Sequence, residues 1–137
     1  MAFSLDGLIV ENQESLVDRI VKDAIGQIPS YAAAPLQTTI ARVEQALTAV
    51  ADSIRENDPG ILEQHLVQIA AARRQEGYAI LELHAIVHIM ERHLRRDVER
   101  AVGDEVERNA LLALLEAVMN AARMVLSARY VLAAQKP

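Results

Sequence analysis

The stretch Ile69-Ala-Ala-Ala-Arg-Arg-Gln-Glu-Gly-Tyr78, which continues as Ala79-Ile-Leu-Glu-Leu-His-Ala-Ile-Val-His88, decides how this chain is organised. It is typical of the end of one helix, a glycine corner and the start of a long apolar helix. Gly77 stands where helices often end on a left-handed residue, a conformation that glycine adopts without steric cost. Because two arginines and two histidines lie around this corner, any small-molecule chemistry is expected here.

The composition predicts an all-α protein. The chain has 137 residues, which fits a single domain over residues 1–137 with a substantial core. Hydrophobic residues make up 52% of it, with five glycines, four prolines and one phenylalanine, so helix formers far outnumber strand formers.

Charge and composition also limit which partners and which cellular compartment are expected. The net charge is −5, and the basic residues near position 95 alternate with acidic ones, which argues against nucleic acid as a partner. Cysteine is absent, and no basic segment precedes an apolar run at the N-terminus. The apolar run over 110–134 is interrupted by charged and polar residues, which argues against a membrane span. We therefore expect a soluble cytoplasmic protein.

Working outward from the corner, apolar periodicity predicts five main helices. The helix before it runs from Pro59, with Asp58 as N-cap, to about Glu76, and the helix after it spans about 78–102. Earlier helices are expected over about 5–28 and 35–55, joined by a short connection. A last helix, with Asp104 as its cap, continues to about Ala134. At about 1.5 Å per residue it is long enough to protrude from a compact bundle.

The last two helices carry apolar residues on more than one face. Such a helix needs cover on all sides, either at the centre of the monomer or from a second subunit. We expect a homodimer formed through these two helices. The candidate interface residues are Ile86, Ile89, Leu111, Leu112, Leu115, Val118, Met119 and Leu126.

No catalytic centre is indicated. The serines lack a nucleophile-elbow motif, and no glycine-rich phosphate loop follows a strand. His84 and His88 are four residues apart with Glu91 following, a spacing that can hold a metal ion. The alternative is that both histidines lie at the edge of the core, hydrogen-bonded to carboxylates or backbone. His65 and His93 are expected to be more exposed.

Arg73 continues the apolar stripe of Leu62, Leu66 and Ile69, so it points to the core or its rim. Either its stem covers apolar surface while its head reaches water, or the guanidinium is buried and needs a carboxylate or several carbonyls.

Two segments resemble the N-terminal domains of RsbR and RsbRD-type regulators of the bacterial stressosome. Ala72-Arg-Arg-Gln-Glu-Gly77 is similar to the Arg-x-x-x-Gly corner of that family, and Glu11 to Tyr31, ending Ile28-Pro-Ser-Tyr31, is similar to its first helix. The resemblance implies a globin-like fold, dimerisation through the last two helices, and other stressosome-type proteins as partners. Regulators of this family usually carry a C-terminal STAS domain, so the chain is expected to be a separate input domain or a free-standing version.

The more distant resemblance to haem-binding globin-coupled sensors implies that this chain lacks the histidine that holds haem iron. Their proximal histidine lies four residues before the corner glycine, and here Gly77 is preceded at that distance by Arg73, a poor iron ligand. No cofactor is therefore expected.

Three hypotheses follow. The first is a non-haem, globin-like sensory domain that relays signals along its C-terminal helix. The second is a haem or metal sensor using His84 or His88. The third is a helical domain that binds an unidentified small molecule in a cavity between the helices over 35–55, 59–76 and 78–102.

Overall fold

The computed structural model describes residues 3–135, and side chains as far as Arg129. In this part of the chain all regular structure is helical, which confirms the all-α prediction. The helices are α1 (Leu5–Glu11), α2 (Gln13–Gln27), α3 (Pro29–Ala33), α4 (Leu36–Arg55), α5 (Pro59–Gln75), α6 (Ile80–Ala101) and α7 (Glu105–Gln135).

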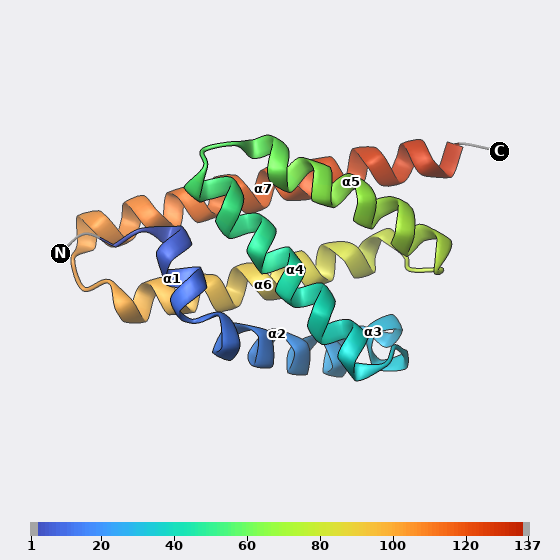
Figure 1. Ribbon diagram of the computed structural model, residues 1–137, viewed down its shortest axis with the longest axis horizontal. Helices are drawn as coiled ribbons and strands as arrows, with labels where there is room; N and C mark the ends of the chain where they lie inside the picture. The colour runs from blue at the N-terminus through green and yellow to red at the C-terminus, as the bar shows by residue number, and fades with distance from the viewer. Residues whose placement is uncertain (1–2, 136–137) are drawn as a thin grey trace.

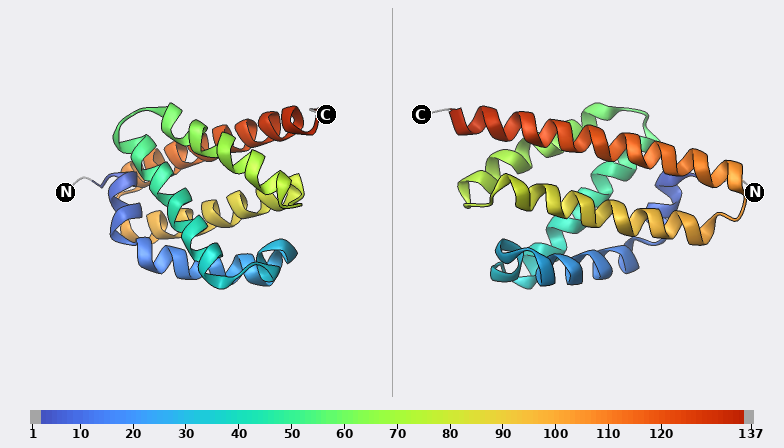
Figure 2. Two further views of the ribbon diagram at one scale, coloured as in Figure 1. Left: turned by 45° about the vertical axis from the view of Figure 1, so that its right-hand side comes forward. Right: turned by 180° about the vertical axis from the view of Figure 1, so that it is seen from behind.

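The long antiparallel pair α6 and α7 forms the back of the molecule, and α4 crosses in front of α6 (Figure 1). α5 packs along α7, and α2 packs against α6 and α4. The same pairing of α6 and α7 is visible from behind in Figure 2. The core lies where α4, α5, α6 and α7 meet, and its fully buried side chains include Leu47, Leu83, Leu115, Met119 and Leu126. The corner between α5 and α6 therefore lies at one end of this core.

The first predicted helix, over 5–28, is divided in two. The chain leaves helical geometry at Asn12, with φ −105° and ψ 13°, and the Asn12 side-chain amide donates to the Leu8 carbonyl at 2.9 Å. Asparagine competes for backbone hydrogen bonds in this way, which makes it a weak helix former. The break frees α1 to pack against α4 and α6. The predicted connection after Ile28 also contains one short helix, α3.

The corner has the predicted geometry. Gly77 has φ +90°, the Gly77 N–H donates to the Arg74 carbonyl at 3.1 Å, and the Tyr78 N–H donates to the Arg73 carbonyl at 2.9 Å. This pair of bonds is the Schellman motif, which satisfies carbonyls at a helix end. The N-cap predictions are also confirmed, because Asp58 accepts from the Gly60 N–H and Asp104 accepts from the Glu107 N–H.

α7 is long and incompletely covered. At about 1.5 Å per residue, its 31 residues span about 46 Å. Within the described residues, 105–129 is one helix long and apolar enough to cross a membrane by length and composition. Only 28% of its most apolar window is buried. Much of the apolar surface of α7 therefore faces outward in the single chain.

Candidate functional site

A polar cluster at the α5–α6 corner joins this connection to α3, α4 and α5. Glu76 accepts from Arg42 of α4 at 2.6 Å and from Arg73 of α5 at 3.0 Å. Arg42 also donates to the Tyr78 hydroxyl at 3.1 Å, and that hydroxyl donates to the Ser30 carbonyl of α3 at 3.3 Å. The Glu76 carboxylate thus faces two guanidinium groups, and a second carboxylate, Glu82, accepts from Ser30 and from the Ala79 N–H at the same corner.

The guanidinium of Arg73 is buried, since its side chain is only 10% exposed. The sequence left two positions possible for the Arg73 guanidinium, in water or buried. In the structure it is buried, and Glu76 supplies the carboxylate that it needs. Its side-chain hydrogen bond to Glu76 spans three residues across the end of α5. Arg73, four residues before Gly77, is therefore a buried charged side chain paired with Glu76.

Two tyrosines form the floor of this corner. The rings of Tyr31 and Tyr78 pack edge to face with their centroids 5.3 Å apart, and the guanidinium carbons of Arg42 and Arg73 each lie 6.0 Å from the Tyr78 ring centroid. Burial raises the pKa of Tyr31 to about 12, and the positive charge of Arg73 opposes that rise. Tyr31 is therefore a neutral hydroxyl at physiological pH.

A cavity of about 60 Å³ adjoins the corner inside the bundle. Its apolar lining comes from α4, α5, α6 and α7, and its polar lining residues are Tyr31, Arg42, His65 and Arg73. The predicted location between the helices over 35–55, 59–76 and 78–102 is therefore the location of a cavity, which α7 also lines. No carboxylate belongs to this lining among the described residues.

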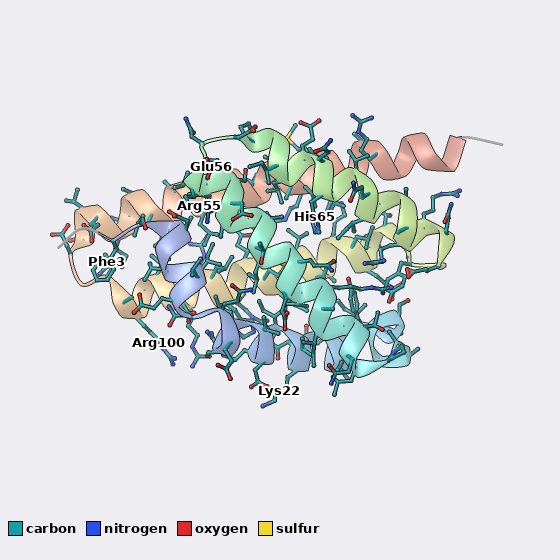
Figure 3. All side chains as sticks on the ribbon, viewed as in Figure 1. Phe3, Lys22, Arg55, Glu56, His65 and Arg100 are labelled. Atoms are coloured by element: carbon teal, nitrogen blue, oxygen red, sulfur yellow. The ribbon has the colours of Figure 1, made fainter. Side chains whose placement is uncertain are left out.

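His65 faces this interior from α5. Figure 3 shows it on the inner side of that helix, whereas Lys22 and Arg100 lie at the outer edge of the molecule. Its Nε2 atom is buried and has no hydrogen-bond partner among the described residues. Burial lowers the pKa of His65, and the nearby positive charge of Arg73 lowers it further. The imidazole is therefore held in its neutral form.

His84 and His88 are not brought together with a third ligand. His84 Nε2 lies 2.8 Å from the Ser127 hydroxyl of α7, whereas His88 is exposed. Glu91 is paired with Arg123 of α7 and lies 3.8 Å from Arg95. Within residues 3–135, no group of three or more histidines and carboxylates has an arrangement that could hold a metal ion.

The prediction that His93 is exposed was wrong, because its exposed fraction is only 7%. His93 Nε2 lies 2.6 Å from the Asp23 carboxylate and Nδ1 lies 3.4 Å from the Arg19 guanidinium, both on α2. Since an arginine can only donate, Nδ1 accepts and the Nε2–H donates to Asp23. The hydrogen bond from His93 is the main reason that the pKa of Asp23 is lowered. This cluster fastens α2 to α6.

The eight candidate interface residues divide into two groups. Ile89, Leu115, Met119 and Leu126 are almost fully buried in the core of the single chain, so their side chains are already covered. Ile86, Leu111, Leu112 and Val118 are half-buried and pack at the edge of that core.

A different face of α7 is uncovered. We call it the α7 outer face, and its residues repeat every three or four positions. They are Val106, Ala110, Ala113, Ala117, Ala121, Met124 and Ala128. Val106 is 80% exposed and Met124 is 73% exposed. The face thus consists of five alanines and two exposed larger apolar side chains, and contiguous exposed apolar surface is typical of contacts with another molecule.

Reasoning from the sequence missed several site residues. Glu76, Tyr78 and His65 were assigned no role, although Glu76 and Tyr78 directly flank the corner glycine. A buried Arg73 needs a carboxylate, and the i+3 spacing of Glu76 was the signal that could have identified it. The contribution of Arg42 from α4 depends on how the helices cross, which local sequence does not specify.

Comparison with known proteins identifies the family but offers no described relative. Among the curated proteins and the solved structures, none matches the chain. A family model described as the RsbT co-antagonist protein rsbRD N-terminal domain matches residues 14–135, which covers α2 to α7. The suspected resemblance is thereby confirmed, and the chain belongs to the family of RsbT co-antagonist protein rsbRD N-terminal domains.

Proposed function

We propose that this chain is the non-catalytic sensory domain of a stressosome-type regulator in the cytoplasm, with a globin-like arrangement of its helices. It acts as a homodimer and relays signals along α7. The family assignment supports a regulatory role together with proteins such as RsbT. Neither nucleic acid nor a membrane is a partner in this proposal.

The single observation that carries the dimer is the α7 outer face. It extends from Val106 to Ala128, about 33 Å of helix at 1.5 Å per residue, and it is apolar throughout. The exposed Leu114 borders this face, whereas Leu111, Leu112 and Val118 pack at the edge of the core. A two-fold axis crossing such a face pairs it with itself, which covers the same residues on both subunits.

A second copy is a better occupant of this face than a lipid bilayer. The apolar window of α7 contains Glu116 and Arg123, and a charged side chain at the centre of a bilayer costs about 2.5–3.5 kcal/mol. Arg123 is also paired with Glu91 of α6, so insertion of α7 alone would break that pair. α7 packs along both α5 and α6 in the folded chain.

The α6–α7 contact is the proposed route of the signal. His84 of α6 bonds to Ser127 of α7 near one end of the pair, and Arg123 bonds to Glu91 one turn away. A shift of α6 at the corner therefore reaches α7 through two polar contacts. These contacts adjoin the α7 outer face, so a shift there also changes the proposed dimer surface.

The test is the oligomeric state of an Ala117→Glu variant, with Ala41→Glu on exposed α4 surface as the matched control. Sedimentation equilibrium should give a dimer for the wild-type chain and for Ala41→Glu, and a folded monomer for Ala117→Glu. A wild-type monomer at micromolar concentration would refute the dimer. Flotation of the wild-type chain with anionic lipid vesicles, lost in Ala117→Glu, would instead assign the face to a membrane.

A further inference from the structure

A surface groove lies between α2 and α4, and the end of α1 also lines it. We call it the α2–α4 groove. Figures 1 and 2 show α2 on the opposite side of α6 from α7, and no α7 residue lines the groove among the described residues. Along α2 the lining runs from Gln13 to Ile25, which is about 18 Å at 1.5 Å per residue. The groove is therefore about three helical turns long.

The floor of the groove is apolar and partly open to solvent. Val10 is 57% exposed, Leu36 is 53% exposed and Ile25 is 36% exposed, and these side chains come from three different helices. The remaining apolar lining residues are less exposed, and they are Val17, Val21 and Ile40. Exposed apolar side chains that gather on one surface and are rimmed by polar residues mark a contact with another molecule.

The charged lining of the groove is mostly acidic. It holds the carboxylates of Glu11, Glu14, Asp18 and Glu44, and one cation, Lys22. Lys22 lies 3.1 Å from Asp18, and Figure 3 shows it at the outer edge of the molecule. Glu11, Glu14 and Glu44 form no ion pair with another described residue. The groove therefore presents three uncompensated negative charges around an apolar floor.

This combination specifies the chemistry of an occupant. An amphipathic helix lays its apolar face into an apolar groove, with contacts spaced at three and four residues. Positive charges beside that face would meet the unpaired carboxylates, and complementary charge raises both the rate and the specificity of association. A bilayer fits less well, because the carboxylates would repel the anionic lipids that hold basic protein surfaces at a membrane.

A second copy of this chain also fits less well. Its exposed apolar surface on α7 is the α7 outer face, and the exposed residues of that helix include the carboxylates of Glu105 and Glu116. Arg129, an exposed cation of α7, already lies 3.9 Å from Glu63 of α5. Carboxylates of α7 would therefore meet carboxylates of the groove. The favoured occupant is a helix from a different protein.

We propose that the α2–α4 groove binds a basic amphipathic helix of a partner protein. The apolar side chains of that helix lie on the floor formed by Val10, Ile25 and Leu36, and its lysines or arginines face Glu14 and Glu44. This docking site is additional to the dimer proposed above, because the groove takes no residue from α7 among the described residues.

The experiment is a fluorescence anisotropy titration of labelled synthetic peptides with the full chain. The peptides are alanine-rich and have about 15 residues, or about four turns of helix. The first carries leucines at every third or fourth position with lysines on both sides. It should bind at one saturable site, with an affinity that falls as salt concentration rises, because exposed charges are screened. Peptides with glutamates in place of the lysines, or serines in place of the leucines, should not bind.

Variants of the apolar floor locate the site. Leu36→Ser should weaken binding of the lysine–leucine peptide about fivefold or more, because less apolar surface is buried. Val10→Ser should weaken it in the same direction, which keeps the test decisive if Leu36→Ser fails to fold. The matched control is Leu81→Ser, which changes a leucine that is 77% exposed on α6 and lies outside the groove lining. It should leave binding unaltered.

Variants of the acidic rim test the charge. The double variant Glu14→Gln, Glu44→Gln should weaken the same peptide about threefold or more, since it removes two exposed charge pairs. The control is Glu99→Gln, Glu105→Gln, which makes the same change in net charge at exposed positions outside the lining. It should leave binding nearly unchanged.

Several results would overturn the proposal. These are equal affinity for the lysine and glutamate peptides, no saturable binding to the folded wild-type chain, or equal weakening by the two double variants. Flotation with phosphatidylcholine vesicles that is lost in Leu36→Ser would also overturn it, by assigning the groove to a membrane. Each readout is independent of oligomeric state, so a failure here is distinguishable from a failure of the proposed dimer.

Discussion

Arg73 shows how one residue links the corner to the interior. Its position on the Leu62, Leu66 and Ile69 stripe predicted that it would lie at the core, and its burial follows from that periodicity. Its surroundings were less predictable, because Arg42 reaches Tyr78 from α4 and Tyr31 packs on Tyr78 from α3. Helical periodicity specifies which side of a helix is buried, whereas the crossing of helices decides what it meets there.

Removing the Glu76 carboxylate tests the charge balance at this residue scale. Glu76→Gln leaves the buried Arg73 guanidinium without its opposing charge, and we expect a loss of about 1–2 kcal/mol in the free energy of unfolding. This is below the usual cost of breaking a buried pair because water reaches Glu76, whose side chain is 36% exposed. Urea denaturation measures the loss.

The control is Glu56→Gln, which removes an exposed carboxylate from its contact with Arg55. It should leave the free energy of unfolding unchanged, since pairs between exposed side chains contribute little. Equal losses in the two variants would contradict a special role for Glu76.

The lowered pKa of His65 predicts that the free energy of unfolding depends on pH. Its pKa in the folded chain is lower than the ordinary value of 6.5, so the unfolded chain binds the proton more readily. The contribution of His65 to the free energy of unfolding should therefore be complete above pH 6.5. The free energy of unfolding should decrease as the pH falls through that value. Urea denaturation at about pH 7.5 and about pH 5.5 should show this decrease in the wild-type chain.

The matched pair for this measurement is His65→Gln and the exposed His88→Gln. The decrease should be smaller in His65→Gln and unchanged in His88→Gln. Identical decreases in the wild type and both variants would show that another group is responsible.

At the scale of elements, the helices after Pro35 were predicted closely, because proline, glycine and capping residues mark their ends. The first helix was not. Its apolar residues repeat without interruption from α1 into α2, and the break at Asn12 follows from a side-chain hydrogen bond and from the packing of α1 on α4 and α6. One asparagine is a weak signal against a long periodic pattern, so tertiary contacts decide such a break.

Alanine substitutions at two glycines are expected to change the free energy of unfolding in opposite directions. Gly77→Ala forces a side chain into a backbone with φ +90° and should lower the free energy of unfolding by about 1 kcal/mol or more. Gly26 is exposed in helical α2, and a Cβ there would meet nothing within 4 Å. Gly26→Ala should therefore raise the free energy of unfolding by about 0.5–1 kcal/mol.

Thermal unfolding measures both glycine variants under one condition. A stabilised Gly77→Ala variant would contradict the left-handed corner, and a destabilised Gly26→Ala variant would contradict its open helical environment.

At the scale of the whole molecule, the candidate interface residues and the exposed face of α7 are different sets, and the dimer interface stays a prediction. The candidates Ile89, Leu115, Met119 and Leu126 lie in the core, because α5 and α6 both pack on α7 and cover two of its faces. The exposed α7 outer face consists mainly of alanines, which carry little hydrophobic signal individually. Which apolar face stays exposed depends on the packing of three helices, and periodicity alone does not specify it.

If α7 pairs with a second copy, thermal stability depends on protein concentration. Association stabilises the folded state by mass action, so the wild-type melting temperature should rise over a hundredfold increase in concentration. Ala117→Glu should melt at one temperature throughout that range. A wild-type melting temperature that stays constant, measured by calorimetry, would contradict the dimer.

The alanines of the α7 outer face have a geometric consequence. A surface of methyl groups allows a neighbouring helix axis to approach to the short end of the 8–10 Å range for packed helices. A partner with bulky side chains at the facing positions is held too far away for close contact along Ala110 to Ala128. If a second copy covers this face, steric exclusion would favour identical copies over related chains that carry larger residues on the same helix.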